Sequence, residues 1–432
     1  MLNNGTLVDL DLLGPARVTG LIGQGGQGFV YRVQQASGRM LALKWYRPES
    51  ASDQQRQGIR TLVDFGAPDH RYLWPLSMAE VVGVPGFGYV MELREPKFLE
   101  LSRLLANRDA HGHELQVSFA ATIAMCRQLA GSFLRLHARG LCYRDISFGN
   151  VFFEPASGNI LICDNDNVGV DNGESRVLGT PFFMAPEVVA DTTFATLPNT
   201  DTDRHSLAVL LFYILFTGHP LEGRLTEGGL RDPAWLTQHF GSGAVFCLHP
   251  ERTENRPPAI VQQYWDLYPG FLRELFLHAF VDGLRDPGAR VTEGQWLKAM
   301  DRLGDAMVRC SCGTTGFFDD ADPDRLCRSC GVALTPPFVL QVGRRRIAVS
   351  AMAQVRGDHV GVDADQPTPL AAVRAHPQDA NRWGLSNLTD QPWTAHYAGD
   401  QRVTVAPGAT VELTAGQRID LAGGSVYVVA PS

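Results

Sequence analysis

The sequence predicts an α+β chain in which a two-lobed domain precedes a cysteine-rich segment and an all-β sandwich. Three observations support this prediction. Residues 15–95 alternate short β-like runs with turns, whereas residues 98–303 carry apolar residues at helical spacing. Four cysteines then lie close together, and from residue 338 short β-like runs recur between turn residues.

Length and charge limit the class of protein. A chain of 432 residues is long enough for two or three domains with sizeable cores. Its net charge of −8 argues against a nucleic-acid-binding protein, which needs a basic surface. The N-terminus lacks the basic and apolar regions of a secretory signal, and the longest apolar run, residues 206–216, is too short to span a bilayer. We therefore expect a cytoplasmic protein without nucleic-acid or membrane partners.

Two motifs lie in the strand-rich lobe, after an N-terminal extension predicted for residues 1–14. Residues 23–30 read GQGGQGFV and match G-x-G-x-x-G-x-V. Glycines let the backbone approach a phosphate closely and offer it N–H groups, although the same pattern is typical of a structural hairpin. Ala42-Leu43-Lys44 follows at the spacing of a second phosphate-contacting motif, and Val90-Met91-Glu92-Leu93 closes the lobe.

The helical lobe carries further motifs in a fixed order. Residues 143–150 read YRDISFGN, which is close to H-R-D-x-x-x-x-N but has Tyr143 in place of His. After a short predicted hairpin comes Asp164-Asn165-Asp166, followed by Gly179-Thr180-Pro181 and by Met184-Ala185-Pro186-Glu187. Together with the motifs of the first lobe, these matches are too many and too well ordered for coincidence. Residues 15–303 are therefore identified as a member of the eukaryotic-like, bacterial-type Ser/Thr protein kinase family.

This resemblance implies ATP as the phosphate donor and Mg²⁺, with Mn²⁺ as an alternative, as the metal ion. The implied catalytic residues are Lys44, Asp145, Asn150 and Asp164, of which Asn150 and Asp164 bind the metal ion. The implied nucleotide-binding residues are Gly23, Gly25, Gly28, Val30, Ala42, Lys44, Met91, Glu92 and Leu93. Ser175 is the expected regulatory phosphorylation site, with Arg144 as the partner of the phosphate, and Arg290 is the expected partner of Glu187.

Departures from the family keep a second hypothesis open. The predicted helix over residues 50–64 contains no glutamate to pair with Lys44, and Asp53 or Asp64 is the candidate substitute. Ser147 stands where a lysine usually steadies the γ-phosphate. An active kinase that phosphorylates protein hydroxyls, including its own, is favoured because the four nucleotide- and metal-handling groups are present. The alternative is a nucleotide-binding pseudokinase scaffold, and the segment ending at Glu187 argues against a small-molecule kinase.

The four clustered cysteines predict a metal site over residues 308–334. Cys310, Cys312, Cys327 and Cys330 form two pairs, each followed by a glycine, and such pairs are typical of a tetrahedral zinc ribbon. Free or disulfide-bonded cysteines are the alternative. Four protein ligands leave no open coordination position, so we expect a structural and not a catalytic zinc ion.

Residues 338–432 resemble a divergent forkhead-associated (FHA-like) β-sandwich. The resemblance depends on Val342-Gly343-Arg344, on residues 384–388 and on residues 413–419. The family's S-x-x-H phosphate-binding motif is not evident. The three arginines at 344–346 either bind an anion or form a basic turn that faces solvent. We expect this domain to dock a protein substrate or signalling partner.

Overall fold

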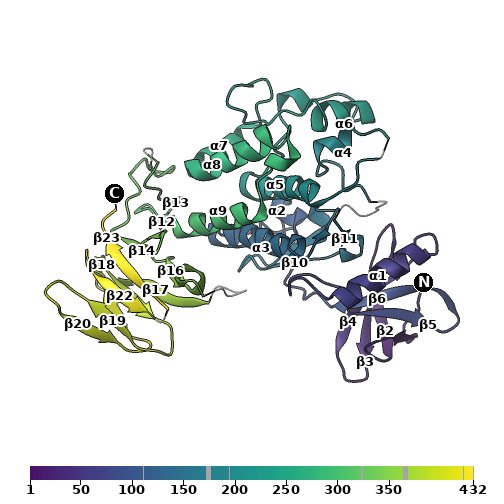
Figure 1. Ribbon diagram of the computed structural model, residues 1–432, viewed down its shortest axis with the longest axis horizontal. Coiled ribbons are helices and arrows are strands. Elements are labelled where there is room, and N and C mark those ends of the chain that lie inside the picture. The colour runs from purple at the N-terminus through teal and green to yellow at the C-terminus, as the bar shows by residue number, and fades with distance from the viewer. Residues whose placement is uncertain are drawn as a thin grey trace. The chain divides into compact units, whose positions relative to one another are not determined.

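The computed structural model describes residues 1–109, 111–171, 177–193, 195–322, 325–362, 368–421 and 423–431 (Figure 1). The chain divides into two compact units. Unit 1 comprises Met1–Pro258 and Phe276–Leu297, and unit 2 comprises Ala259–Leu275 and Lys298–Ser432. No helix among the described residues has both the length and the apolar character needed to cross a membrane.

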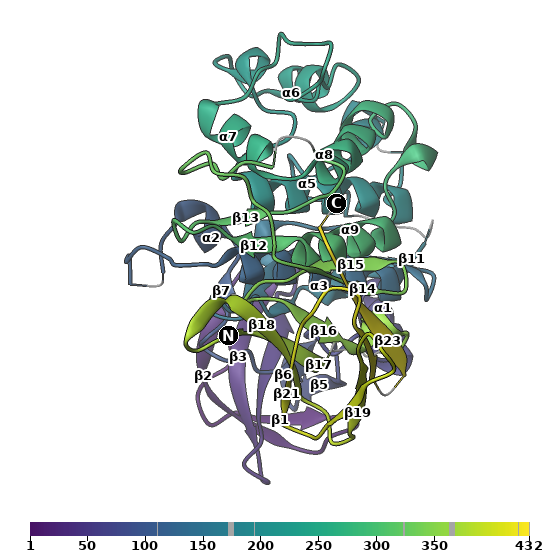
Figure 2. The ribbon, with the colours of Figure 1, turned by 90° about the vertical axis from the view of Figure 1, so that its left-hand side faces the viewer.

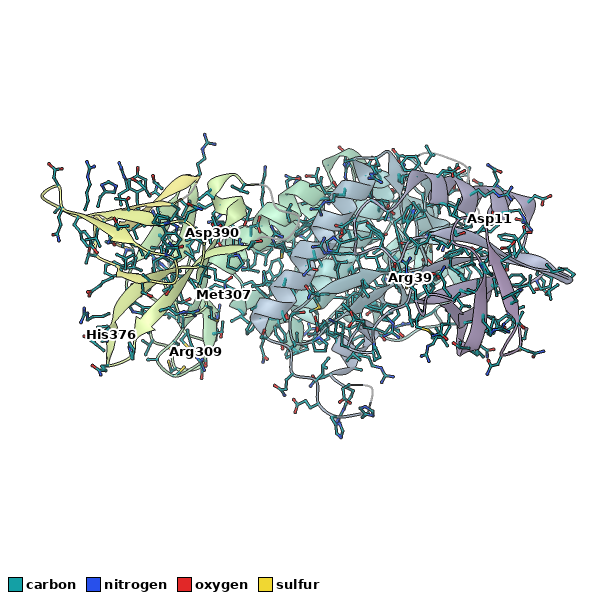
Figure 3. The ribbon with its side chains drawn as sticks, turned by 90° about the horizontal axis from the view of Figure 1, so that it is seen from below. Asp11, Arg39, Met307, Arg309, His376 and Asp390 are labelled. Carbon is teal, nitrogen blue, oxygen red and sulfur yellow. The ribbon has the colours of Figure 1, made fainter. Side chains whose placement is uncertain are left out.

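The small lobe of unit 1 is an antiparallel barrel, whose strands hydrogen-bond in the order β1-β2-β3-β4-β6-β5. Its elements are β1 (Leu7–Leu10), β2 (Ala16–Gln24), β3 (Gly28–Gln35), β4 (Met40–Tyr46), α1 (Asp53–Phe65), β5 (Ser77–Val81) and β6 (Val84–Glu92). The segment expected to be an N-terminal extension thus supplies β1, which pairs with both β2 and β5 and closes the barrel. In Figure 3, Asp11 directly follows β1 and Arg39 lies in the turn between β3 and β4.

Helix α1 has a clear start and end. The side chain of Ser52 accepts a hydrogen bond from the backbone N–H of Gln55, which satisfies one of the free donors of the first turn. Gly66 ends the helix with φ of 70°, a conformation that glycine adopts at little steric cost. The helix buries Ile59 and Leu62 and leaves most of its other side chains accessible.

The large lobe of unit 1 is mostly helical, as the periodicity predicted. Its helices are α2 (Ser102–Ala106), α3 (Phe119–His137), α4 (Pro186–Ala190), α5 (Thr200–Phe216) and α6 (Pro233–Phe240). Its short strands are β7 (Leu99–Glu100), β8 (Leu141–Cys142), β9 (Val151–Phe153), β10 (Ile160–Ile162) and β11 (Gly169–Val170). Helix α5 contains the apolar run of residues 206–216, which is mostly buried, and the Phe212 ring meets the rings of Phe216, Phe246, Phe276 and Phe280.

Unit 2 contains α7 (Ala259–Leu267), most of α8 (Gly270–Leu277), the part of α9 (Glu293–Asp305) that begins at Lys298, a small hairpin and two β-sheets. The hairpin joins β12, whose ends Met307 and Arg309 are labelled in Figure 3, to β13 (Thr315–Phe317). The first sheet has the strand order β15-β14-β23-β22-β19-β20 and the second β16-β17-β18-β21. Figure 2 labels β14, β15, β19 and β23 of the first sheet and all four strands of the second. The strands are β14 (Val339–Val342), β15 (Arg345–Ala348), β16 (Gln354–Arg356), β17 (Pro369–His376), β18 (Asp379–Asn387), β19 (Trp393–His396), β20 (Arg402–Val405), β21 (Thr410–Glu412), β22 (Arg418–Leu421) and β23 (Gly424–Val429).

The two sheets share one apolar core, in which Trp393 is fully buried. Beside this core, the arginine turn makes ion pairs within unit 2. Arg345 lies 3.1 Å from Asp301 and 3.5 Å from Asp358, and Arg346 lies 2.5 Å from Asp320. Two of the three arginines that were candidates for anion binding are thus already paired with carboxylates.

Candidate active site

The first part of the site lies on one face of the barrel. Lys44 on β4 is directly opposite Tyr89 on β6 and Val30 on β3. Because side chains alternate along a strand, Tyr46 points to the same face as Lys44. The tips of Lys44, Tyr46 and Tyr89 therefore converge on one volume below the glycine-rich loop.

The ammonium of Lys44 is buried and is surrounded by oxygen atoms. Its Nζ lies 2.7 Å from Oδ1 of Asp164, 2.9 and 2.8 Å from the two carboxylate oxygens of Asp166, and 3.0 Å from Oε1 of Gln27. Burial by itself opposes the charged form, but the two carboxylates outweigh it and raise the pKa of Lys44 well above its usual value. Lys44 is therefore a fixed cation on the floor of the site.

The expected substitutes for the missing glutamate are wrong. Asp53 and Asp64, the two carboxylates of α1, are both exposed, whereas Lys44 is buried. Helix α1 instead contributes Gln55, whose Nε2 donates to the hydroxyl of Tyr46 at 3.2 Å and to the backbone oxygen of Asp166 at 3.4 Å. The carboxylate that accompanies the metal-ligand candidate Asp164 at Lys44 comes from Asp166 and not from the helix.

The glycine-rich loop joins β2 and β3 above Lys44. The backbone N–H of Gly25 donates to the oxygen of Gly28 at 2.9 Å and closes the turn. A Cβ on Gly28 would lie 2.3 Å from the backbone oxygen of Trp45, so close packing on β4 requires glycine there. A Cβ on Gly23 or Gly25 would meet no atom within 4 Å, which leaves room beside these two backbones.

The segment that ends the small lobe is the other wall of the predicted nucleotide site. Ala42 on β4 lies opposite Met91 on β6, and both side chains are buried. Glu92 follows at the exposed end of β6 and forms an ion pair with Arg39, and Leu93 lies directly beyond the strand. Ala42, Met91, Glu92 and Leu93 stay candidates for contact with the nucleotide.

The catalytic-loop candidates lie close together. Nδ2 of Asn150 donates to the backbone oxygen of Asp145 at 2.8 Å and to its Oδ2 at 3.3 Å. The hydroxyl of Thr180 donates to Oδ1 of Asp145 at 2.6 Å. Both carboxylate oxygens of Asp145 are thus oriented by hydrogen bonds, and the amide oxygen of Asn150 remains as a candidate metal ligand.

Backbone contacts position the loop that carries Asp164. The N–H of Cys163 donates to the backbone oxygen of Asn150 at 2.9 Å, and the hydroxyl of Tyr143 donates to the backbone oxygen of Cys163. Tyr143 thus fills the place of the usual histidine by holding the residue before Asp164. Asp164 itself has φ of 54°, and the next residue, Asn165, is buried and donates to the backbone oxygen of Leu73 at 2.9 Å.

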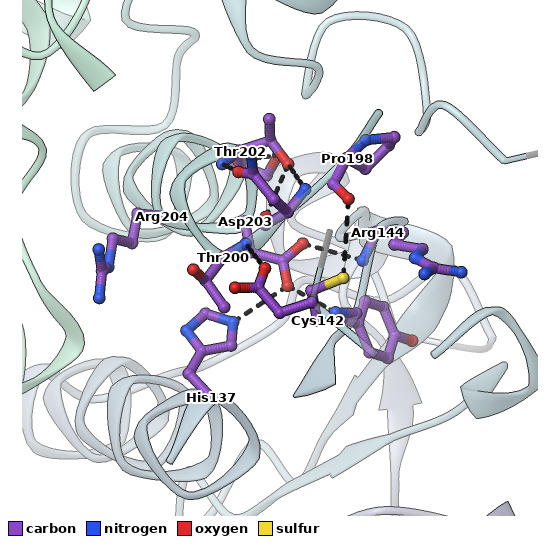
Figure 4. A network of polar contacts seen from close by, with 12 residues as sticks. His137, Cys142, Arg144, Pro198, Thr200, Thr202, Asp203 and Arg204 are labelled. Atoms are coloured by element: carbon purple, nitrogen blue, oxygen red, sulfur yellow. Dashed lines mark hydrogen bonds and ion pairs between the residues drawn. The ribbon is translucent and has the colours of Figure 1, made fainter. Parts of the chain in front are cut away.

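Asp203 at the start of α5 holds the catalytic loop from behind (Figure 4). Its Oδ2 accepts from the N–H of Tyr143 at 2.5 Å and its Oδ1 from the N–H of Arg144 at 2.8 Å. His137 donates from Nε2 to Asp203 at 3.0 Å and from Nδ1 to Glu293 at 2.8 Å. Burial disfavours the imidazolium, yet these two carboxylates raise the pKa of His137 to about 9.

The expected ion pair at the end of the activation segment is confirmed. Arg290 is buried, and its two terminal nitrogens lie 2.8 and 2.6 Å from the two carboxylate oxygens of Glu187. Bidentate pairs of this kind fix both partners in orientation as well as in distance. Ser175, the predicted phosphorylation site, lies outside the described residues.

The donor atoms at Asp164 and Asn150 fit a hard divalent cation. Both side chains offer oxygen atoms, which are the ligands that Mg²⁺ and Mn²⁺ prefer. Burial, together with the charges of Asp166 and Asp145, raises the pKa of Asp164 against the opposite effect of Lys44. A cation near Asp164 would relieve this repulsion between carboxylates.

The cysteine cluster in unit 2 fits a tetrahedral metal ion. The Sγ atoms of Cys310, Cys312, Cys327 and Cys330 all lie within 4.8 Å of one another, and the four thiols are free. Two of these sulfur pairs are 3.5 and 3.6 Å apart, close to the roughly 3.8 Å expected for Zn–S bonds of about 2.3 Å in a tetrahedron. The backbone N–H of Cys310 donates to the oxygen of Thr314 and that of Cys327 to the oxygen of Val332, so both halves form similar turns.

Sequence reasoning missed three polar groups of the site. Asp166 was given no role, and Tyr46 and Tyr89 were not considered. The signals were present, since a second acid follows Asp164 and a tyrosine follows Lys44 at strand spacing. The pairing of β6 with β4, which brings Tyr89 beside Lys44, could not be predicted from the sequence.

Comparison with known proteins agrees with this geometry. The model of the protein kinase domain family matches residues 16–232. The serine/threonine-protein kinase AfsK of Streptomyces coelicolor is 27% identical over 328 residues, which cover 69% of this chain and 36% of that protein. The probable serine/threonine-protein kinase zyg-1 of Caenorhabditis briggsae is 28% identical over 205 residues, which cover 46% and 26%. NUAK family SNF1-like kinase 2 of Rattus norvegicus is 24% identical over 236 residues, which cover 52% and 33%. The chain thus spans about a third or less of the length of these curated relatives.

Proposed function

Because this chain belongs to the protein kinase domain family, we propose that it is an ATP-dependent Ser/Thr protein kinase that phosphorylates protein hydroxyls, including its own. One observation carries the proposal. The backbone contact between Cys163 and Asn150 places the loop with Asp145 beside Asp164, which in turn pairs with Lys44. A cation, two acids and an amide from three separate motifs thus meet at one place.

The roles follow from the chemistry of phosphoryl transfer, in which the protein positions the reactants and stabilises charge. Asp145 orients the attacking hydroxyl and accepts its proton. Lys44 contacts the α- and β-phosphates, and the open backbones of Gly23 and Gly25 cover them. Asn150 and Asp164 hold Mg²⁺ or Mn²⁺, which supplies charge neutralisation on the phosphates when bound.

The serine at position 147 bears on the expected rate of phosphoryl transfer. It is buried and uncharged, so the site lacks the cation that usually steadies the γ-phosphate beside Asp145. The loss of one preorganised charge typically costs about 3–4 kcal/mol of transition-state stabilisation. A slow kinase is therefore the expected phenotype.

The residues of unit 2 suit a docking role. The four cysteines hold a structural zinc ion with no open coordination position. The FHA-like sandwich recognises a protein substrate or signalling partner, and the whole chain acts in the cytoplasm. The phosphoanion role of the arginine turn is less supported, because Arg345 and Arg346 already pair with carboxylates.

One observation favours the alternative, a nucleotide-binding pseudokinase scaffold. The buried Ser147 supplies no positive charge beside Asp145. A site without that charge would still bind nucleotide and metal through Lys44, Asn150 and Asp164 but would transfer no phosphate.

Incubation with Mg-ATP separates the two functions. The purified chain and a library of Ser- and Thr-containing peptides are mixed with Mg-ATP, and phosphosites are mapped by mass spectrometry. The kinase proposal predicts phosphoserine or phosphothreonine on the chain or the peptides. Bound nucleotide without any transferred phosphate would establish the scaffold instead.

A further inference from the structure

The carboxylate of Asp166 lies at the centre of a buried polar cluster. Its side chain has no exposed surface, and its two oxygens lie 2.9 and 2.8 Å from Nζ of Lys44. The hydroxyl of Tyr46 donates to Oδ2, and that of Tyr89 lies 3.4 Å from Oδ1. A buried carboxylate needs this many donors, because an unpaired charge in the interior is strongly destabilising.

The barrel places these donors. Lys44 and Tyr89 are direct partners across β4 and β6, and Tyr46 lies two residues beyond Lys44 on the same face. Three side chains from two adjacent strands therefore point to one spot, which the segment after Asp164 fills with Asp166. The strand register therefore determines where these three donors lie.

Asp164 and Asp166 differ in access to solvent. The side chain of Asp164 is 41% exposed, whereas that of Asp166 is fully buried. A metal ion bound to nucleotide phosphates can reach the first carboxylate but not the second. When Asp164 turns to such an ion, Asp166 remains as the carboxylate partner of Lys44.

Helix α1 leaves a cavity beside this buried cluster. A cavity of about 340 Å³ is lined by Gly58 and Thr61 of α1 and by Asp166. Gly58 has no side chain that could extend toward the cluster, and a Cβ built there would meet no atom within 4 Å, so the space beside this position is open. The contact from α1 is the amide of Gln55, which donates to Tyr46 and to the backbone oxygen of Asp166.

We propose that Asp166 is the positioning residue for Lys44 and takes the role that a helix glutamate has in related kinases. This inference builds on the proposed nucleotide site. Its consequence is that one short segment, residues 164–166, carries both the metal ligand and the partner of Lys44. Substitutions that remove charge from α1 should therefore leave nucleotide handling unchanged.

The test compares Asp166→Asn with Asp64→Asn. Asparagine preserves size and removes only the charge, and Asp64→Asn removes an exposed carboxylate from α1 as a matched control. Affinity for a fluorescent ATP analogue is measured without divalent metal, and kcat/KM for ATP is measured with Mg²⁺. Asp166→Asn should weaken both, with a loss in kcat/KM of at least tenfold and up to the order of 10²-fold. Asp64→Asn should match the wild type within twofold.

A charge relocation provides a second readout. Gln55→Glu should lower ATP affinity in the wild type, because it adds a carboxylate beside Asp166, and raise it in the Asp166→Asn background. A residue with a merely structural role would not reverse the sign of that effect.

The outcomes separate this inference from the proposed function. If the wild type transfers no phosphate, the metal-free affinities still compare Asp166→Asn with the wild type. Equal affinity and equal kcat/KM in Asp166→Asn and the wild type would overturn the role of Asp166 while leaving the kinase proposal intact. If Asp166→Asn does not fold, the variant Tyr46→Phe tests the role of Asp166 instead. It removes one donor from Asp166 and should lower kcat/KM several-fold, and wild-type kinetics in that variant would overturn the inference.

Discussion

Replacing His137 by glutamine should remove a pH-dependent part of the stability of the large lobe. His137 lies between Asp203 and Glu293, and its imidazole donates to both. Burial opposes the imidazolium, but the two hydrogen bonds raise the pKa from 6.5 to about 9. Glutamine can occupy a similar volume and donate one hydrogen bond, but it carries no charge at any pH.

The size of the effect follows from proton linkage. Because the folded-state pKa is the higher one, the imidazolium stabilises the fold fully below about pH 6.5, and this contribution disappears as the pH rises through about 9. A pKa change of this size corresponds to about 3 kcal/mol at pH 6, about 2 kcal/mol at pH 7.5 and almost nothing at pH 10. The hydrogen bond from His137 also lowers the pKa of Glu293 to about 2 against the effect of burial. The pKa changes of His137 and Glu293 arise from one interaction, so its free energy is counted once.

Urea unfolding of the wild type and His137→Gln at pH 6, 7.5 and 10 measures this difference directly. Other groups that titrate in this range do so in both proteins and cancel in the comparison. The free-energy difference between the two proteins should shrink by about 3 kcal/mol from pH 6 to pH 10. A difference that stays constant across the three pH values would show that the charge on His137 does not stabilise the fold.

Two further predictions concern the ion pair at Glu187 and the cysteine cluster. Glu187→Gln should lower the free energy of unfolding by about 3 kcal/mol, because it leaves the buried Arg290 without its carboxylate, and a loss below about 1 kcal/mol in urea unfolding would contradict this. Joint replacement of Cys327 and Cys330 by serine should remove about one zinc ion per chain, as measured by mass spectrometry of the metal content, and leave phosphorylation of short peptides intact. Wild-type protein without zinc, or a folded double variant that no longer phosphorylates peptides, would refute the structural role.

Motif spacing was enough to select candidate side chains that the structure brings close together. Lys44, Asp145, Asn150 and Asp164 each lie within a short stretch of fixed spacing, so local sequence identifies them. The pairing of Glu187 with Arg290 was also predicted, because the family resemblance implies it, and the structure bears it out.

The partner of Lys44 could not be predicted in the same way. The family resemblance places this carboxylate on the helix that became α1, so the predicted substitutes were Asp53 and Asp64. The actual arrangement depends on the register between β4 and β6 and on the path of the chain after Asp164, neither of which is local in sequence. Strand β1 was missed for a similar reason, because it is four residues long and pairs with β5 about 70 residues away.

Phosphate transfer by Asp145→Asn, compared with the wild type, tests the central claim most directly. Transfer of the γ-phosphate from Mg-ATP to a Ser- or Thr-containing peptide is measured for both proteins, alongside the dissociation constant for ATP. We expect the wild type to transfer phosphate, and Asp145→Asn to bind ATP equally well but to transfer it at least about 10²-fold more slowly, the usual contribution of a positioned general base. Equal rates in the two proteins, or a wild type that binds Mg-ATP and transfers none, would contradict the account.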